Sequence, residues 1–167
     1  MYESFQALID DYNKQKIPVH DLIIQNEIQI NEITEDQIRA KVKRSLQVML
    51  ESIEKSTNVE TMRPLPIKEA MGQSKLMDSE PFFLRKDIKD AVFRAMSIAE
   101  YSSGMGVICT APTAGSCGVF PATLFEAIDM MGIKPDDVRV ENAFIVGAEI
   151  GGIIGNKTSV SGSEGGC

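Results

Sequence analysis

Two glycine-rich segments carry the residues whose types and spacing could do chemistry. The first, at positions 106–118, combines glycines with threonine, serine and two cysteines directly before a predicted helix. A loop of this kind at a helix N-terminus presents free backbone N–H groups to an anion such as a carboxylate. The other interpretation is a tight connection that needs glycine backbone conformations and binds nothing. The residue types alone leave both interpretations open.

The second segment, residues 155–167, places Lys157, Glu164 and Cys167 among small residues. Its lysine-threonine pair is similar to part of a phosphate-binding P-loop. A P-loop requires a glycine directly before that pair, in a loop that leaves a strand. Asn156 occupies the position here, a helical stretch precedes it, and the glycines follow the lysine. A nucleotide site is therefore not expected, and the three reactive side chains argue against a simple flexible tail.

Six predicted helices position these segments. The clearest begins with a capping box, in which the Thr34 hydroxyl and the Gln37 amide satisfy free backbone N–H groups. Apolar residues then recur at helical spacing to about residue 57, at Ile38, Val42, Leu46, Met49 and Ile53. Further helices are expected at about 3–16, 19–30, 85–101, 119–131 and 136–154. Strand patterns are weak throughout, so the predicted fold class is mainly α, a helical domain with glycine-rich loops that is incomplete at the C-terminus.

Changes in composition divide the chain into three predicted parts. Residues 1–57 form an N-terminal helical region, 58–84 a connecting loop interrupted by prolines, and 85–167 a glycine-rich region. The last predicted helix contains Gly147, Ala148, Gly151 and Gly152. Glycine costs a helix about 1 kcal/mol relative to alanine, so this cluster predicts the close approach of another backbone.

Composition also excludes several classes of protein. The chain is 43% apolar and 25% charged, as soluble globular proteins are. It has no apolar run long enough to span a membrane and no apolar signal segment near its first residues, so we expect a cytoplasmic protein without a membrane partner. A net charge of −7 disfavours nucleic acid as a partner. One histidine and three cysteines without a C-x-x-C pair do not suit a closed zinc site.

The sequence A-P-T-A-G-S-C-G at 111–118, together with N-K-T-S-V-S-G-S-E-G-G-C at 156–167, resembles the signature pair of the α chain of bacterial iron–sulfur-dependent L-serine dehydratases. The N-terminal helices, including the stretch that ends in Gln47-Val48-Met49, also resemble the start of that chain. The resemblance implies a lyase that converts L-serine to pyruvate and ammonia with a [4Fe–4S] cluster and without pyridoxal phosphate. It further implies a heterodimer with a β chain, a role in amino-acid degradation and gluconeogenesis, and that residues 85–167 begin the catalytic iron–sulfur domain.

The same resemblance implies roles for individual residues. Cys167 matches the first cluster ligand, Lys157 and Ser161 are matched as catalytic residues, and the substrate-binding positions are Thr113, Gly115, Asn156, Ser159 and Gly162. Lys157 is a candidate for the base that removes the Cα proton, but a lysine among glycines more often anchors the substrate carboxylate or the backbone. Cys109 and Cys117 match no cluster position, so we expect them to be small, buried apolar side chains.

The chain departs from the family pattern at its last residue. The other two cluster cysteines of the family lie in later motifs, and one thiolate cannot hold a cubane, so this polypeptide by itself is expected to be inactive. A second hypothesis is a non-catalytic helical module that binds a small carboxylate or amino acid. A third is a related enzyme that acts on another small amino acid with a hydroxyl or thiol group.

Overall fold

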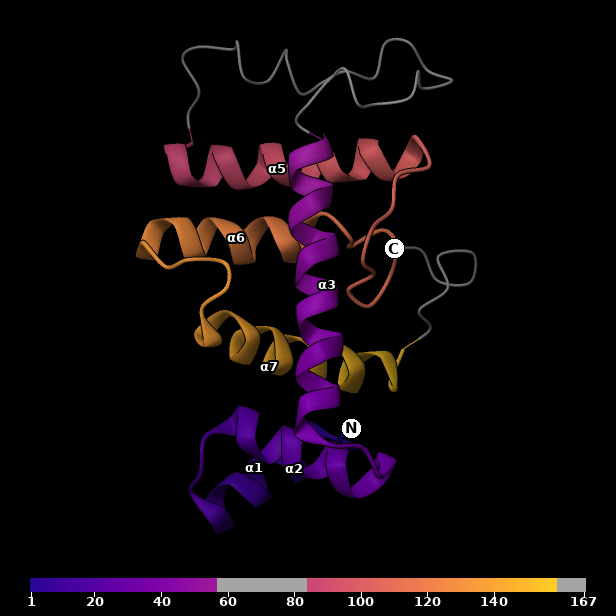
Figure 1. The fold of residues 1–167 in the computed structure, drawn as a ribbon, viewed down its shortest axis with the longest axis vertical. Helices are drawn as coiled ribbons and strands as arrows, with labels where there is room; N and C mark the ends of the chain where they lie inside the picture. Colours follow the sequence, from indigo (N-terminus) through magenta and orange to yellow (C-terminus); the bar gives the residue numbers. More distant parts are fainter. Residues whose placement is uncertain (57–83, 159–167) are drawn as a thin grey trace. The chain divides into compact units, whose positions relative to one another are not determined.

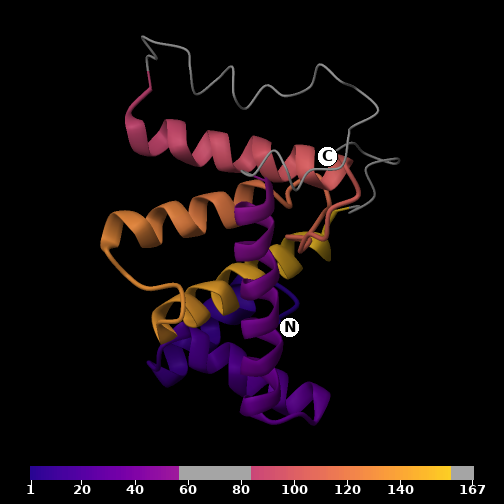
Figure 2. The same cartoon turned by 45° about the horizontal axis from the view of Figure 1, so that its top comes forward.

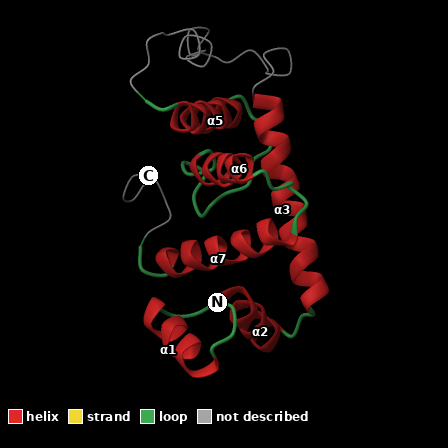
Figure 3. Ribbon diagram, turned by 90° about the vertical axis from the view of Figure 1, so that its left-hand side faces the viewer, coloured by secondary structure: helices red, strands yellow, loops and turns green. Residues whose placement is uncertain are grey.

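The computed structural model describes residues 1–56 and 84–158, and within these ranges every regular element is an α-helix (Figure 3). The helices are α1 (Phe5–Gln15), α2 (Val19–Asn31), α3 (Glu35–Ser56), α5 (Lys86–Ser103), α6 (Val119–Met131) and α7 (Val138–Gly155). The predicted mainly α class is confirmed. All six predicted helices are present, and their ends differ from the expected positions by one or two residues at most.

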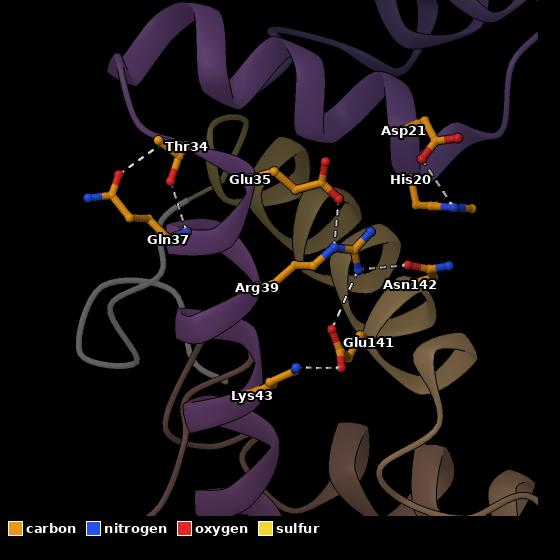
Figure 4. A network of polar contacts seen from close by, with 9 residues as sticks. All are labelled: His20, Asp21, Thr34, Glu35, Gln37, Arg39, Lys43, Glu141 and Asn142. Carbon is orange, nitrogen blue, oxygen red and sulfur yellow. Dashed lines mark hydrogen bonds and ion pairs between the residues drawn. The ribbon is translucent and has the colours of Figure 1, made fainter.

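Side-chain caps mark the beginning of three helices. At α1, Ser4 Oγ accepts the Ala7 backbone N–H at 3.2 Å. The predicted capping box is confirmed at α3. The backbone N–H of Gln37 donates to Thr34 Oγ1 at 3.3 Å, and the backbone N–H of Thr34 donates to the side-chain oxygen Oε1 of Gln37 at 2.9 Å (Figure 4). At α7, the carboxylate of Asp137 accepts the Arg139 backbone N–H at 2.8 Å. These bonds satisfy N–H groups that the first turn of a helix leaves without partners.

Three helices end on a residue in the left-handed conformation. These residues are Lys16, Glu32 and Gly132, with φ angles of 56°, 52° and 63°. The left-handed conformation stops a helix and lets backbone N–H groups bond to its last carbonyls. At Gly132, the place that a Cβ atom would take has no neighbouring atom within 4 Å. Glycine is therefore favoured there by the backbone conformation and not by lack of space.

The chain divides into two compact units, which we treat separately. The first unit comprises residues 1–46 and 136–167, and its described part contains α1, α2, the first half of α3, and α7. The second comprises residues 47–135, with the rest of α3, α5 and α6. These boundaries differ from those of the segments 1–57, 58–84 and 85–167 expected from composition, and that division stays a prediction.

In the first unit, α2 contacts both α1 and α7. The buried apolar side chains of this unit are Tyr2, Leu8, Leu22, Ile23, Ile24, Ile38, Val42, Leu46, Val140, Ile145 and Ile153. The predicted apolar stripe of α3 is buried at all five positions. Three of them lie in the first unit, and the other two, Met49 and Ile53, belong to the second. The stripe is therefore confirmed as the inward face of α3.

An ion-pair network joins α3 to α7 within the first unit (Figure 4). Arg39 Nε donates to Glu35 Oε1 at 2.7 Å, and its Nη1 lies 3.5 Å from Glu141 Oε2 and 3.3 Å from Asn142 Oδ1. Lys43 Nζ lies 3.5 Å from the other Glu141 oxygen. Glu141 is buried, and a buried carboxylate is costly unless cations or hydrogen bonds compensate it. The two cations of α3 therefore fix the position of this carboxylate on α7.

In the second unit, α5 and α6 lie side by side and run in opposite directions (Figures 1 and 2). Gly118 lies where α6 begins, and a Cβ atom there would come within 3.0 Å of the Ala95 carbonyl oxygen on α5. Arg94 on α5 forms ion pairs with Glu126 and Asp129 on α6. The missing side chain at Gly118 thus lets the beginning of α6 approach the middle of α5 closely. No helix in the described ranges is long and apolar enough to cross a membrane.

Candidate functional site

Two hydroxyl groups hold the loop between α5 and α6 in a closed turn. Ser116 Oγ lies 2.9 Å from Thr113 Oγ1 and 2.8 Å from the Ala111 carbonyl oxygen, and the Ser116 amide donates to Thr113 Oγ1 at 3.2 Å. The Ala111–Pro112 peptide bond, which directly precedes Thr113, is cis. Hydroxyl groups spaced three residues apart commonly close turns by bonding to nearby backbone groups. The turn at residues 113–116 is therefore a shaped element and not a loose connection.

This turn leaves two backbone amides available to a ligand. In the described part of the chain, the N–H groups of Ala114 and Gly115 donate to no other group, and both residues are exposed. The first turn of α6 offers less, because the Val119 amide donates to the preceding loop at 3.2 Å and Pro121 has no N–H. Donors for an anion therefore come from the turn before α6 more than from the helix end itself.

Among the residues predicted for substrate binding, Thr113 and Gly115 both belong to this turn. Thr113 is half-buried and its hydroxyl is bonded to Ser116, whereas Gly115 is exposed. Sequence reasoning did not single out Ser116, the residue with the most bonds in the loop. The spacing Thr-x-x-Ser between residues 113 and 116 was the signal that could have found it.

Asn156 and Lys157 form the exposed turn that follows α7. Their backbone amides donate back to α7, to the carbonyl oxygens of Gly152 at 3.0 Å and Ile154 at 2.9 Å. The Asn156 side-chain amide contacts the thioether of Met1, with Nδ2 3.5 Å from Sδ. Lys157 is exposed, and its ammonium makes no ion pair with any other described residue.

The remaining predicted site residues, Ser159, Ser161, Gly162 and Cys167, lie outside the described residues. The loop at 106–118 belongs to the second unit and the turn at Asn156 to the first. The prediction that both face one cavity therefore stays a prediction.

The two described cysteines do not form a cluster site. Cys117 is buried, and burial raises the pKa of its thiol, so the thiolate that an iron ligand requires is disfavoured. Cys109 is half-buried, with its sulfur 3.8 Å from the Thr110 carbonyl oxygen. No set of three or more histidine, cysteine or acidic side chains within residues 1–56 and 84–158 could hold a metal ion. The prediction of a small buried side chain is confirmed for Cys117, while Cys109 is only partly buried.

A pocket lies between α5 and α6, apart from the described residues predicted for the site. It is an open apolar pocket of about 490 Å³, lined chiefly by Ile88, Val92, Ala95, Met96, Val119 and Met130. At its edge, burial raises the pKa of the Glu126 carboxyl, whose Oε2 lies 3.5 Å from Arg94 Nη1 but accepts no hydrogen bond in the described part of the chain. None of the predicted site residues that the structure describes lines this pocket, and the sequence patterns did not reveal it.

Comparison with known proteins identifies the family. A family model described as serine dehydratase alpha chain matches residues 14–167, and this range includes both glycine-rich loops. The chain belongs to this family. It is 28% identical over its whole length to the L-serine dehydratase alpha chain of Peptoniphilus asaccharolyticus. It is 30% identical, again over its whole length, to a probable L-serine dehydratase alpha chain of Bacillus subtilis (strain 168).

The similarity extends to a relative whose name mentions no separate chains. Over 94% of its length, the chain is 27% identical to the L-serine dehydratase TdcG of Escherichia coli (strain K12), of which the match covers 35%. The matches to the two alpha chains cover 57% and 55% of those proteins, so the chain spans about half the length of these relatives. No solved structure matches it.

Proposed function

We propose that the chain is the first half of the α chain of an iron–sulfur L-serine dehydratase, a lyase that converts L-serine to pyruvate and ammonia. The observation that carries the proposal is the family match over residues 14–167, because it contains both signature loops. The family membership makes L-serine the proposed substrate, and the alpha-chain names of the relatives make a β chain the proposed partner. The proposed location is the cytoplasm.

The chain's own residues suit the binding of a small amino acid. The amides of Ala114 and Gly115, which donate to no group among the described residues, can donate to one substrate carboxylate, and the exposed ammonium of Lys157 adds a positive charge. Thr113 and Ser116 hold the turn in shape before substrate arrives, which lowers the entropy cost of binding. The proposed substrate contacts of Asn156, Ser159 and Gly162 come from the second loop.

The elimination needs two further groups. A base must take the Cα proton of serine, and Lys157 and Ser161 are the proposed catalytic residues. Hydroxide must then leave from the β-carbon, and the product aminoacrylate hydrolyses to pyruvate and ammonia. A [4Fe–4S] cluster with one open iron would supply a Lewis acid for the serine hydroxyl. Cys167 is the proposed ligand from this chain, and further cysteines of a complete α chain would be required.

Replacing cysteines in a complete α chain tests the proposal. We expect the α chain, produced without oxygen together with its β chain, to bind iron and form pyruvate from L-serine. Cys167→Ser should abolish the iron content and the activity together. Cys109→Ser is the matched control, since Cys109 matches no cluster position, and it should retain both.

Two results would contradict the proposal. Normal iron content and activity in Cys167→Ser would show that this cysteine is not a ligand. A colourless, inactive wild-type protein that still binds L-serine in calorimetry would favour the non-catalytic binding module.

A further inference from the structure

The first two residues of the chain make contacts with α7 that no sequence pattern indicates. The Tyr2 backbone N–H donates to the Glu149 carboxylate, across a sequence separation of 147 residues. Both residues are buried, Tyr2 with 8% and Glu149 with 5% of its surface exposed. A hydrogen bond to a buried charged group is among the stronger kinds, and losing it would leave both groups without compensation.

Met1 continues this contact toward the end of α7. Its thioether lies against Gly152, where a Cβ atom would come within 3.0 Å of the Met1 sulfur and terminal methyl group. The absence of a side chain at Gly152 therefore makes room for Met1. The small-residue stretch of α7 was expected to admit another backbone, and at Gly152 the structure places the Met1 side chain there instead.

The same thioether touches the turn that follows α7. The Asn156 side-chain amide donates to Met1 Sδ at 3.5 Å. Sulfur in a thioether is a weak acceptor, so this bond can orient the amide without holding it against a stronger acceptor. A substrate carboxylate or hydroxyl oxygen would be such an acceptor.

Tyr2 and Met1 are themselves fixed to the other helices of the first unit. The Tyr2 hydroxyl donates to Asp11 Oδ2 on α1 at 3.1 Å, and the Met1 amino group forms an ion pair with Glu27 on α2. Burial and the neighbouring Asp11 raise the pKa of Tyr2 to about 12, so its hydroxyl keeps its proton at any physiological pH.

We propose that Met1 and Tyr2 form a clasp that positions the Asn156–Lys157 turn, through Glu149 and Gly152 on α7. Glu149 and Gly152 are positioning residues in this scheme, and Asn156 is the residue that would meet the substrate. The inference rests on the proposed function, because only that function gives Asn156 a substrate. The inference goes beyond the proposed function because it adds residues that lie outside both signature loops.

Substitutions at Glu149 test the clasp in the complete α chain with its β chain. Glu149→Leu removes the acceptor of the Tyr2 N–H, and we expect KM for L-serine to rise about tenfold while kcat changes less than threefold. Glu149→Gln keeps an oxygen acceptor and should restore KM to within about twofold of the wild type. Glu141→Gln is the matched control: it also alters a buried carboxylate of α7, but one bound to Arg39 and Lys43, so it should lower stability and leave KM unchanged.

Gly152→Ala separates positioning from stability. Alanine favours the helix more than glycine does, yet its methyl group displaces the Met1 thioether from Asn156. We expect KM to rise about threefold while the melting temperature stays equal or increases. If the substitution only damaged the fold, KM would rise and the melting temperature would fall.

Hydrogen exchange provides a readout that needs neither cluster nor activity. In Glu149→Leu, the amides of residues 150–158 should exchange faster than in the wild type, and in Glu149→Gln and Glu141→Gln they should not. The clasp would be overturned if Glu149→Leu left both the hydrogen-exchange rates and KM unchanged. It would also be overturned if Glu149→Leu and Glu149→Gln raised KM and lowered kcat and stability to the same extent. If the wild-type enzyme forms no pyruvate, the proposed function fails, and the exchange data alone then decide whether the clasp exists.

Discussion

Two glycines of the second unit are required for different physical reasons. Gly132 ends α6 with φ at 63°, in open space, so only the backbone conformation disfavours a side chain there. Gly118 has an ordinary φ of −89°, but the Ala95 carbonyl oxygen occupies the place of a Cβ atom. Any side chain at Gly118 must therefore push α6 away from α5, whereas a residue that tolerates the left-handed conformation fits at Gly132.

Asparagine distinguishes the two cases, because it adopts the left-handed conformation more readily than other residues but is larger than alanine. Gly132→Ala should lower the free energy of unfolding by about 1 kcal/mol, and Gly132→Asn by less. Gly118→Ala should cost about 2 kcal/mol, and Gly118→Asn still more. Urea denaturation followed by circular dichroism measures all four values. The close approach of α5 and α6 would be refuted if Gly118→Asn were as stable as Gly132→Asn.

Among the helices, α7 depends on a charged cap. The Asp137 carboxylate accepts the Arg139 backbone N–H and also binds the Arg139 guanidinium, with Oδ2 2.7 Å from Nη2. The hydrogen bonds from the Arg139 side chain and backbone lower the pKa of Asp137 from 3.8 to about 2. A carboxyl group whose pKa is lower in the folded protein stabilises the fold above its unfolded pKa and loses that effect as the pH falls through the folded value.

The helical content of α7 should therefore decrease as the pH falls from about 4 to about 2, where Asp137 takes up its proton. Asp137→Asn keeps an N-cap oxygen and has no charge to lose, so its acid titration should lack this component. Circular dichroism of the two proteins between pH 5 and pH 1.5 tests this, because the other carboxylates titrate in both and the difference isolates Asp137. Identical curves would show that the cap contributes nothing dependent on its charge.

The helices could be predicted because their signals are local, whereas the contacts between them could not. The capping box at Thr34 and the apolar stripe behind it depend on residues a few positions apart, and both are confirmed. The bond between Tyr2 and Glu149 joins positions 147 residues apart, and no periodic pattern reports it. Glu149, which has only small and apolar residues as its neighbours in the sequence, was still a usable signal, because a buried carboxylate needs a partner.

The candidate site was predictable to a similar extent. The glycine, serine and threonine content at 106–118 was compatible with an anion-binding loop and with a tight connection, and in the structure the amides of Ala114 and Gly115 have no acceptor among the described residues. It could not indicate the hydroxyl bonds that close the turn, since these depend on side-chain conformations at Thr113 and Ser116. The second loop was recognised by motif alone, and most of it lies outside the described residues.

At the scale of the whole molecule, sequence composition and the compact units place α7 with different helices. Composition predicts that α7 belongs with α5 and α6 in a region at 85–167. The compact units instead group α7 with α1 and α2, through the contacts with α2 and the bond from Tyr2 to Glu149. The two divisions predict different parts of the chain to loosen when α7 is destabilised, because local unfolding spreads through the elements that pack on one another.

Asp137→Ala provides the perturbation, since it removes the cap of α7, and among the described residues the Asp137 side chain bonds only to Arg139 of the same helix. If the compact units describe the cooperative behaviour, hydrogen exchange should accelerate in α7, α1 and α2, and α5 and α6 should keep their wild-type rates. If residues 85–167 unfold together, acceleration should instead reach α5 and α6 and spare α1 and α2. Hydrogen exchange at neutral pH, read by mass spectrometry on peptides from each helix, separates these outcomes. Asp137→Asn is the matched control, because its side-chain oxygen still caps the helix, and its exchange should stay close to that of the wild type. Acceleration in all five helices alike would contradict both divisions and indicate one cooperative domain.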